Sequence, residues 1–387
     1  MNAEKVIMAL IRSVVCGEEL KEETVHACTP EMLDKIFSIV KRHAMEHLIG
    51  HALSNLDLPD SMVLSKMKET AILTVYNQIQ LDYECERISE LFTEAKIPFI
   101  FLKGTVMQRY YPEPWMRHRC DVDVLVKEEQ LDAAAQLLIG KFNYTSKGKK
   151  DHDISFRCPS GAYIELHYDT IQERLAVNDC RTVLGRIWED AQPVEDGAYA
   201  YVLSDEMFYF YHMAHMAKHF TCGGCGIRTF LDIWLMNHKM EFDREKREAL
   251  LREGGLLKFA KAAESVSEYW FSGKDPERMD IAVSDYVIRG NQFEGKENRA
   301  AMGQVRHGGK LKYLMTRRVF MRYDYLKVEY PILKKHKWLT PVYQLVRWSR
   351  VLKKGAMRRV TKEISANIRV NEDTSIPVVE LVEYLGL

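Results

Sequence analysis

The chain has 387 residues, of which 47% are hydrophobic and 28% are charged, and its formal net charge is zero. This length exceeds one ordinary domain and predicts two or three. No apolar run approaches the roughly 20 residues that cross a bilayer, the start Met1-Asn-Ala-Glu lacks a signal peptide, and the eight cysteines follow no disulfide spacing. These features exclude an integral membrane protein and a disulfide-bonded secreted one, and they predict a cytoplasmic protein.

The hydrophobic pattern along the chain predicts an α+β protein with helices at both ends. A helical N-terminal segment covers residues 1–95, with a helix opened by Thr29-Pro30 and a long one from about Ser65 to Glu94. Residues 96–200 form a small mixed-sheet α/β core, which also contains a helix from about Lys127 to Ile139. Residues 201–387 form a helical C-terminal region, which includes a basic segment over 299–362.

Two carboxylates stand two residues apart in Arg119-Cys-Asp-Val-Asp-Val-Leu-Val-Lys127. In a strand, side chains at i and i+2 point the same way, so Asp121 and Asp123 project together while the valines face the core. Like charges so close together are unfavourable unless a cation lies between them. Oxygen ligands of this kind suit Mg²⁺ that also holds a polyphosphate. The pair therefore predicts a metal site.

The flanking segments add a phosphate-binding turn and a third carboxylate. An apolar strand, Ile97 to Gly104, ends in Lys103-Gly104 and is followed by a short helix. Glycine lets backbone approach a phosphate, and the N–H groups at a helix start attract anions. Downstream, the alternating strand Gly161–Asp169 places Glu165, His167 and Asp169 on one face, and Glu165 is the candidate third ligand.

Strand, Lys-Gly, helix, arginines, Asp-x-Asp and then Glu-Leu-His together resemble the polymerase-beta-like nucleotidyltransferase superfamily. The resemblance is nearest to the bacterial group labelled "uncharacterised nucleotidyltransferase", and it is clearest from Leu102 to Asp169. It implies that Asp121 and Asp123 bind two Mg²⁺ ions, with Mn²⁺ as the other ion considered, that the Gly104 turn holds triphosphate and that Glu165 completes the metal site. Because Lys-Gly replaces the usual Gly-Ser or Gly-Gly, the phosphate contact falls to Thr105 or Lys103.

Cationic residues supply the other half of the predicted site. Lys103, Arg117 or Arg119 would stabilise phosphate charge. The resemblance also places an H-x-x-K-H and R-x-x-x-D helix pair beside the cleft, which implies that Lys218, His219 and Arg228 contact phosphates or base. Asp232 follows Arg228 at i+4, a spacing that suits an ion pair and leaves a purely structural interpretation open.

Three other patterns suggest different functions. His43-Ala-Met-Glu-His47 matches the H-x-x-E-H pattern of inverted zinc peptidases if both histidines lie on one helix. Cys222-Gly-Gly-Cys225, with His212, His215 and His219 upstream, could bind zinc or remain a reduced helix end. Residues 299–362 contain 18 Lys and Arg against two acids, interleaved with aromatic rings, so this segment could bind RNA, lie on an anionic membrane or only neutralise the acidic remainder.

The sequence as a whole predicts a Mg²⁺-dependent nucleotidyltransferase. It would transfer a nucleoside monophosphate from an NTP to an acceptor hydroxyl of a small molecule, an RNA or a protein, and release pyrophosphate. The alternative is a non-catalytic nucleotide- or RNA-binding regulator on the same fold, such as one half of a toxin–antitoxin pair.

Overall fold

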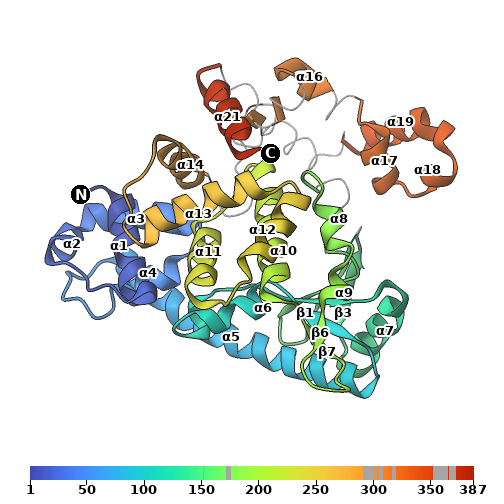
Figure 1. The fold of residues 1–387 in the computed structure, drawn as a ribbon, viewed down its shortest axis with the longest axis horizontal. Coiled ribbons are helices and arrows are strands. Elements are labelled where there is room, and N and C mark those ends of the chain that lie inside the picture. The colour runs from blue at the N-terminus through green and yellow to red at the C-terminus, as the bar shows by residue number, and fades with distance from the viewer. Residues whose placement is uncertain are drawn as a thin grey trace.

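The computed structural model of the chain describes residues 1–150, 152–170, 176–290, 300–301, 303–304, 308–315, 320–351, 365 and 372–387. Within these residues the fold is α+β, with a mixed sheet between two helical regions, as predicted (Figure 1). Residues 299, 302, 305–307, 316–319 and 352–362 of the predicted basic segment lie outside the described part. None of the helices in the described part is long and apolar enough to cross a membrane.

The N-terminal helices are α1 (Ala3–Ile11), which continues into a π-helical turn, α2 (Glu22–Ala27), α3 (Pro30–Arg42), α4 (Glu46–Ala52) and α5 (Met62–Glu94). The predicted start of α3 is confirmed, since the Thr29 side chain accepts a hydrogen bond from the Met32 backbone N–H. The long helix begins a few residues before the predicted Ser65. The reason is that Ser61 caps it, its hydroxyl accepting from the Leu64 N–H.

The sheet has seven strands in the order β3-β4-β5-β2-β1-β7-β6. These strands are β1 (Phe99–Phe101), β2 (Asp121–Val126), β3 (Thr145–Lys149), β4 (Asp153–Arg157), β5 (Tyr163–His167), β6 (Gln192–Pro193) and β7 (Ala200–Val202). β2 pairs in parallel with β5 and β1 pairs in parallel with β7, whereas the other neighbours are antiparallel. The sheet is therefore mixed, and β2 lies near its centre.

The two faces of β2 pack against different helices. Val122, Val124 and Val126 are buried in a core shared with α5 and α7 (Leu131–Phe142). Leu125 points the other way, into a core shared with the helices that follow the sheet. Because side chains alternate along a strand, Asp121 and Asp123 lie on the Leu125 face. The sequence of β2 thus turns its carboxylates away from α5 and toward the C-terminal helices.

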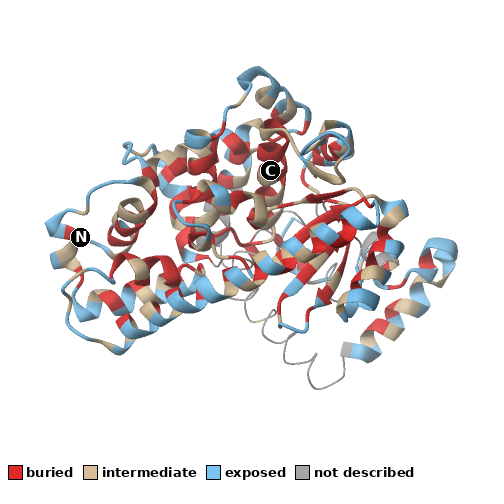
Figure 2. Cartoon of the chain, turned by 90° about the horizontal axis from the view of Figure 1, so that it is seen from below, coloured by how far each residue is buried: buried red, intermediate tan, exposed pale blue. Residues whose placement is uncertain are grey.

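Further helices follow β5 along the chain. They are α8 (Cys180–Leu184), α9 (Ile187–Asp190), α10 (Asp205–Thr221), α11 (Ile227–Lys239), α12 (Arg244–Glu253), α13 (Leu257–Phe271), α14 (Arg278–Arg289), α16 (Lys310–Leu314), α17 (Tyr323–Glu329), α18 (Ile332–Lys335), α19 (Thr340–Val351) and α21 (Glu372–Leu385). Buried residues of α1, α3 and α4 belong to one cluster with those of α10, α11 and α13. Figure 2 shows these buried residues along the strands and the inward sides of the helices.

Candidate functional site

The carboxylates of β2 and β5 lie side by side because the two strands are parallel and in register. Asp123 is the direct partner of Glu165, and Leu125 is the partner of His167. Ile164 and Leu166 are buried on the α5 side, so Glu165 and His167 share the face of Asp121 and Asp123. The alternation predicted from the sequence is confirmed for this strand. Asp169 falls beyond the end of β5 and forms an ion pair with Arg181.

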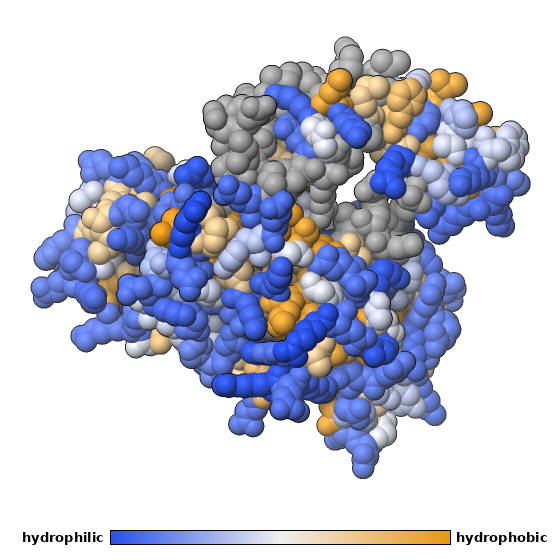
Figure 3. Space-filling model, turned by 45° about the horizontal axis from the view of Figure 1, so that its top comes forward, coloured by the Kyte–Doolittle hydropathy of each residue, from blue (hydrophilic) through white to orange (hydrophobic). Residues whose placement is uncertain are grey.

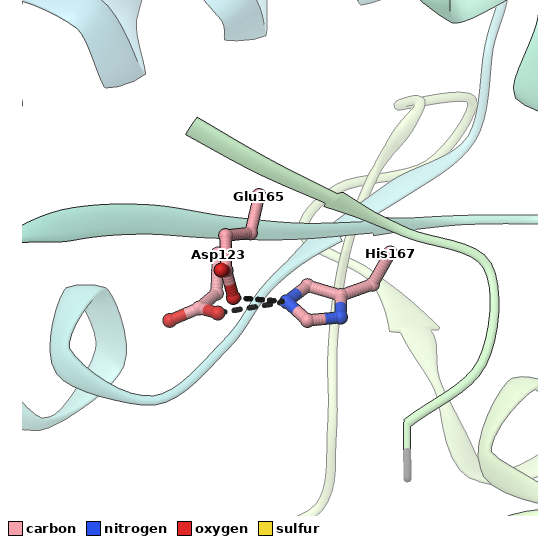
Figure 4. A group of neighbouring side chains, drawn as sticks. All are labelled: Asp123, Glu165 and His167. Atoms are coloured by element: carbon pink, nitrogen blue, oxygen red, sulfur yellow. Dashed lines mark hydrogen bonds and ion pairs between the residues drawn. The ribbon is translucent and has the colours of Figure 1, made fainter. Parts of the chain in front are cut away.

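Three side chains from these strands converge closely enough to hold a metal ion. One ligand atom from each of Asp123, Glu165 and His167 lies within 4.8 Å of the others (Figure 4). The Nε2 atom of His167 lies 2.7 Å from Oδ1 of Asp123 and 3.6 Å from Oε2 of Glu165. Asp123 and His167 are buried and Glu165 is half-buried. The predicted pair of Asp123 and Glu165 is therefore brought together, and His167 joins it.

Asp121 lies on the same face but is not part of this close group. Burial and, after it, the nearby charge of Asp123 together raise the pKa of its carboxyl to about 6. Lys103 acts in the opposite direction. Two carboxylates on one strand face repel each other, and binding of a proton by Asp121 relieves that repulsion. A bound metal ion would relieve it in the same way.

Lys103 supplies a positive charge to this acidic face. It links β1 to the short helix α6 (Gly104–Met107) and adopts φ 48° and ψ −119°, a strained conformation for a residue with a side chain. Its Nζ lies 2.5 Å from Oδ1 of Asp123. Burial opposes the charge on Lys103, but Asp123 more than offsets it and raises the lysine pKa. The side chain predicted to contact phosphate thus contacts the carboxylate of Asp123, a candidate metal ligand.

Gly104 and Thr105 begin α6 beside Arg119. A Cβ atom at Gly104 would lie 3.2 Å from the Cβ of Arg119, so the turn has little room for a side chain. The Thr105 hydroxyl accepts a hydrogen bond from the Arg119 guanidinium at 3.0 Å. Arg119 is buried and also contacts Asp82 and Gln78 of α5. The structure therefore places Arg119 as a brace between α5 and the turn, with Thr105 as one of its partners.

Arg117 is also buried, and it holds the carboxylate that the helical spacing assigned to Arg228. Its Nε and NH2 groups donate to the two oxygens of Asp232, each at 2.7 Å, and Tyr111 donates to Asp232 as well. Arg117 therefore forms the bidentate ion pair of Asp232, while the charge of that carboxylate also acts on Arg228. An arginine 115 residues away in sequence reaches it with bidentate geometry, which a neighbour on the same helix does not offer.

Arg228 instead points its guanidinium at the backbone between Arg117 and Arg119. Its NH1 group donates to the carbonyl oxygen of His118 at 2.6 Å. Burial lowers the pKa of Arg228 to about 10, and the neighbouring charge of Arg117 adds to this effect. The carboxylate of Asp232 acts in the opposite direction and favours the charged form of Arg228.

Helix α10 carries the other predicted cation and several residues that the sequence reasoning did not select. Burial lowers the pKa of Lys218, and the charge of Lys103 lowers it further. Burial likewise lowers the pKa of His219 to about 3, and its ring lies 4.5 Å from that of His215. Tyr211, two turns before Lys218, is buried, and its hydroxyl makes no hydrogen bond within the described residues. Tyr211 stands seven residues before Lys218, and this helical spacing could have placed both on the same side of α10.

The other omitted residue is His167, although its signal was in the sequence. It stands two positions after Glu165, and strand alternation already placed it on the same face. It was omitted because the expected ligands were carboxylates only. An imidazole beside two carboxylates is nevertheless an ordinary donor set for a divalent ion.

The two zinc interpretations are not supported by the arrangement of their residues. His43 ends α3, Ala44 has a positive φ of 49°, and His47 lies in α4, so the two histidines are not on one helix. They contact different carbonyl groups, those of Ile288 and Met116. Cys225 pairs with the Thr229 hydroxyl. Within the described residues, the only group of metal-ligating side chains close enough to share an ion is Asp123, Glu165 and His167.

A mixed sheet that presents carboxylates on adjacent central strands, beside a Lys-Gly turn and a cationic helical wall, has the layout of a nucleotidyltransferase. The family model described as "Uncharacterised nucleotidyltransferase" matches residues 29–272. This match covers more than half of the chain, and the chain belongs to that family. No curated protein and no solved structure matches it.

Proposed function

We propose that the chain is a Mg²⁺-dependent nucleotidyltransferase that transfers a nucleoside monophosphate from an NTP to an acceptor hydroxyl and releases pyrophosphate. The family supports nucleotidyl transfer in general. The proposal of a metal-dependent transfer rests on the register of β2 and β5. This register sets Asp123 directly beside Glu165, and His167 lies 2.7 Å from Asp123. Mn²⁺ is the other ion that we consider, because manganese accepts the same oxygen ligands and also tolerates an imidazole.

The residues of the acidic face fit divalent ions. Asp121 and Asp123 would hold two ions, and Glu165 would complete the site, because carboxylates this close repel one another unless cations lie between them. When bound, such ions neutralise the triphosphate and lower the pKa of the acceptor hydroxyl. Glu165 is half-buried, so it can also take the proton of that hydroxyl. His167 contacts Asp123 and would hold that carboxylate in a fixed orientation.

Basic residues of α10 and α11 would bind the triphosphate. Lys218, His219 and Arg228 would contact phosphates or the base, and the N–H groups of the Gly104 turn would attract the triphosphate as helix starts do. Arg117 is buried against Asp232, and we assign it the positioning of the His118 carbonyl. Arg119 is buried against Asp82, and we assign it the positioning of the Gly104 turn. Lys103 neutralises Asp123 and would be released toward phosphate when an ion takes its place on that carboxylate.

Transfer of label from α-labelled NTP tests the proposal. The protein is incubated with each labelled NTP, Mg²⁺ or Mn²⁺, and separate small-molecule, RNA and protein fractions as acceptors. Asp123→Asn and Glu165→Gln should abolish transfer, because each removes an ion ligand while keeping the shape of the side chain. Asp132→Asn, an equivalent change on the exposed face of α7, should retain it. Equal transfer by all three variants would exclude the proposed site.

The alternative is a non-catalytic nucleotide- or RNA-binding regulator of the toxin–antitoxin type on the same fold. It predicts nucleotide binding that raises the apparent melting temperature without release of pyrophosphate. The experiment separates the two functions, because a regulator would bind NTP and leave the label on the nucleotide with every acceptor fraction.

A further inference from the structure

Residues 320–351 form a small helical lobe with a core of its own. The lobe contains α17, α18, a short turn of helix over Lys337–Leu339, and α19. Its core consists of Leu326, Tyr330 and Leu333, against which Tyr343 and Val346 of α19 pack. One side of α19 is therefore already covered by the lobe, and the other side is available for a different contact.

The outer side of α19 is apolar as well. Trp338 is 75% exposed, Val342 49% and Leu345 60%. Val342 and Leu345 are three residues apart and lie on one side of α19, and Trp338 is exposed in the short turn that precedes it; these three side chains are called the stripe. Ile332 and Phe320 are also exposed on the lobe. In Figure 3, hydrophobic atoms gather along the upper edge of this lobe, next to hydrophilic ones.

Positive charge surrounds this stripe. Lys334, Lys335, Lys337 and Arg350 are exposed around it. Residues 320–350 contain seven Lys and Arg against two acids. One of those acids, Glu329, already lies 3.8 Å from Arg350. An apolar stripe close to the exposed Lys334, Lys335 and Lys337 is complementary to a surface that is both apolar and anionic.

The exposed side chains of the lobe favour lipid over nucleic acid as the anionic partner. Most of the tyrosine rings of the lobe are used internally. Tyr330 is buried, Tyr343 packs on it at 4.7 Å, and the hydroxyl of Tyr323 donates to the Leu333 carbonyl. The stripe itself is mainly aliphatic, and aliphatic side chains cannot stack on bases as rings do. Exposed tryptophan, in contrast, prefers the interface between headgroups and acyl chains.

We propose that the lobe 320–351 is a membrane-surface binding site that takes anionic phospholipid. Trp338, Val342 and Leu345 enter the boundary between headgroups and acyl chains, and Lys334, Lys335 and Lys337 pair with lipid phosphates. The lobe lies on the bilayer and does not cross it. This activity is separate from the acidic face of β2 and β5, and it requires neither nucleotide nor metal.

Sedimentation of the full chain with vesicles tests this proposal, in EDTA and without nucleotide. The protein should bind vesicles of phosphatidylcholine mixed with phosphatidylglycerol, and it should bind phosphatidylcholine alone much more weakly. Val342→Ser with Leu345→Ser should lower the affinity at least about tenfold, because both side chains lose apolar area that the membrane would bury. Lys334→Gln with Lys335→Gln should cost about fivefold per lysine at low salt.

The matched control is Ile72→Ser with Ile79→Ser. These isoleucines are 72% and 63% exposed on α5, so the pair removes a similar exposed apolar area far from the lobe in sequence and should leave vesicle binding unchanged. An equal loss in the control pair would overturn the proposal, as would absence of binding to anionic vesicles at low salt. Binding of single-stranded RNA that weakens in the lysine variant, without vesicle binding, would assign the lobe to nucleic acid instead.

Discussion

Lys103→Met removes the ammonium group that contacts Asp123 at 2.5 Å and leaves this buried carboxylate with His167 as a remaining contact, beside the carboxylates of Asp121 and Glu165. Loss of one partner of a buried ion pair costs about 3 to 5 kcal/mol. For a chain of 387 residues, the entropy of unfolding of about 2.1 cal/mol/K per residue corresponds to about 0.8 kcal/mol per degree. If the chain unfolds as one unit, the melting temperature in EDTA should fall by about 4 to 6 °C.

Divalent metal should reverse this loss. Without an ammonium group on Asp123, Mg²⁺ or Mn²⁺ meets no competitor, so the metal-induced rise in melting temperature should be larger in Lys103→Met than in the native protein. Differential scanning calorimetry with and without metal measures both effects. Lys66→Met, a change at an exposed position in α5, serves as the control and should shift neither value. A variant as stable as the native protein in EDTA, or one that metal does not restore, would refute the reasoning.

Three further predictions concern other buried ionisable side chains. Arg117→Ala should lower the free energy of unfolding in urea by about 3 to 5 kcal/mol, and Arg117→Lys should recover little, because a lysine cannot donate to both oxygens of Asp232; a full rescue by lysine would show that charge alone matters. Burial lowers the pKa of His43 and His47 to about 4, below the unfolded value of about 6.5, so the stability that they contribute is complete above pH 6.5 and is lost as the pH falls toward 4. The slope should be about 1.4 kcal/mol per pH unit for each histidine, and His43→Gln should reduce it if urea unfolding is followed from pH 7 to 4.5. Burial raises the pKa of Asp121 to about 6, so metal must displace its proton below that pH; calorimetric metal affinity should rise about tenfold per pH unit up to 6 and then level, and Asp121→Asn should be flat throughout.

The part of the site on the central strands could be predicted because strand periodicity is local. Alternation alone placed Asp121 and Asp123 on one face of their strand, and Glu165 and His167 on one face of theirs. In the sheet, these residues of β2 and β5 all lie on the same face. What alternation does not supply is the parallel pairing of β2 with β5. The resemblance implied only that Glu165 completes the site, and the parallel pairing itself is seen in the structure.

The strand β3 shows where periodicity fails. It reads Thr-Ser-Lys-Gly-Lys, every residue of it is exposed, and no apolar side chain marks it. It exists because β4 offers a hydrogen-bonding edge, which is a property of the folded sheet. The exposed outer strand was therefore beyond the reach of a hydrophobic pattern, whereas the buried central strands were not.

The bidentate partner of Asp232 could not be predicted for a related reason. Helical spacing suited a pair between Asp232 and Arg228 and left the role of Arg228 open, whereas the two parallel hydrogen bonds to this buried carboxylate come from Arg117. A buried charge requires the geometry that satisfies it best, and that partner is found in three dimensions. Arg228 in turn donates to the His118 carbonyl, a backbone partner to which helical spacing does not point, and burial together with the nearby charge of Arg117 lowers its pKa.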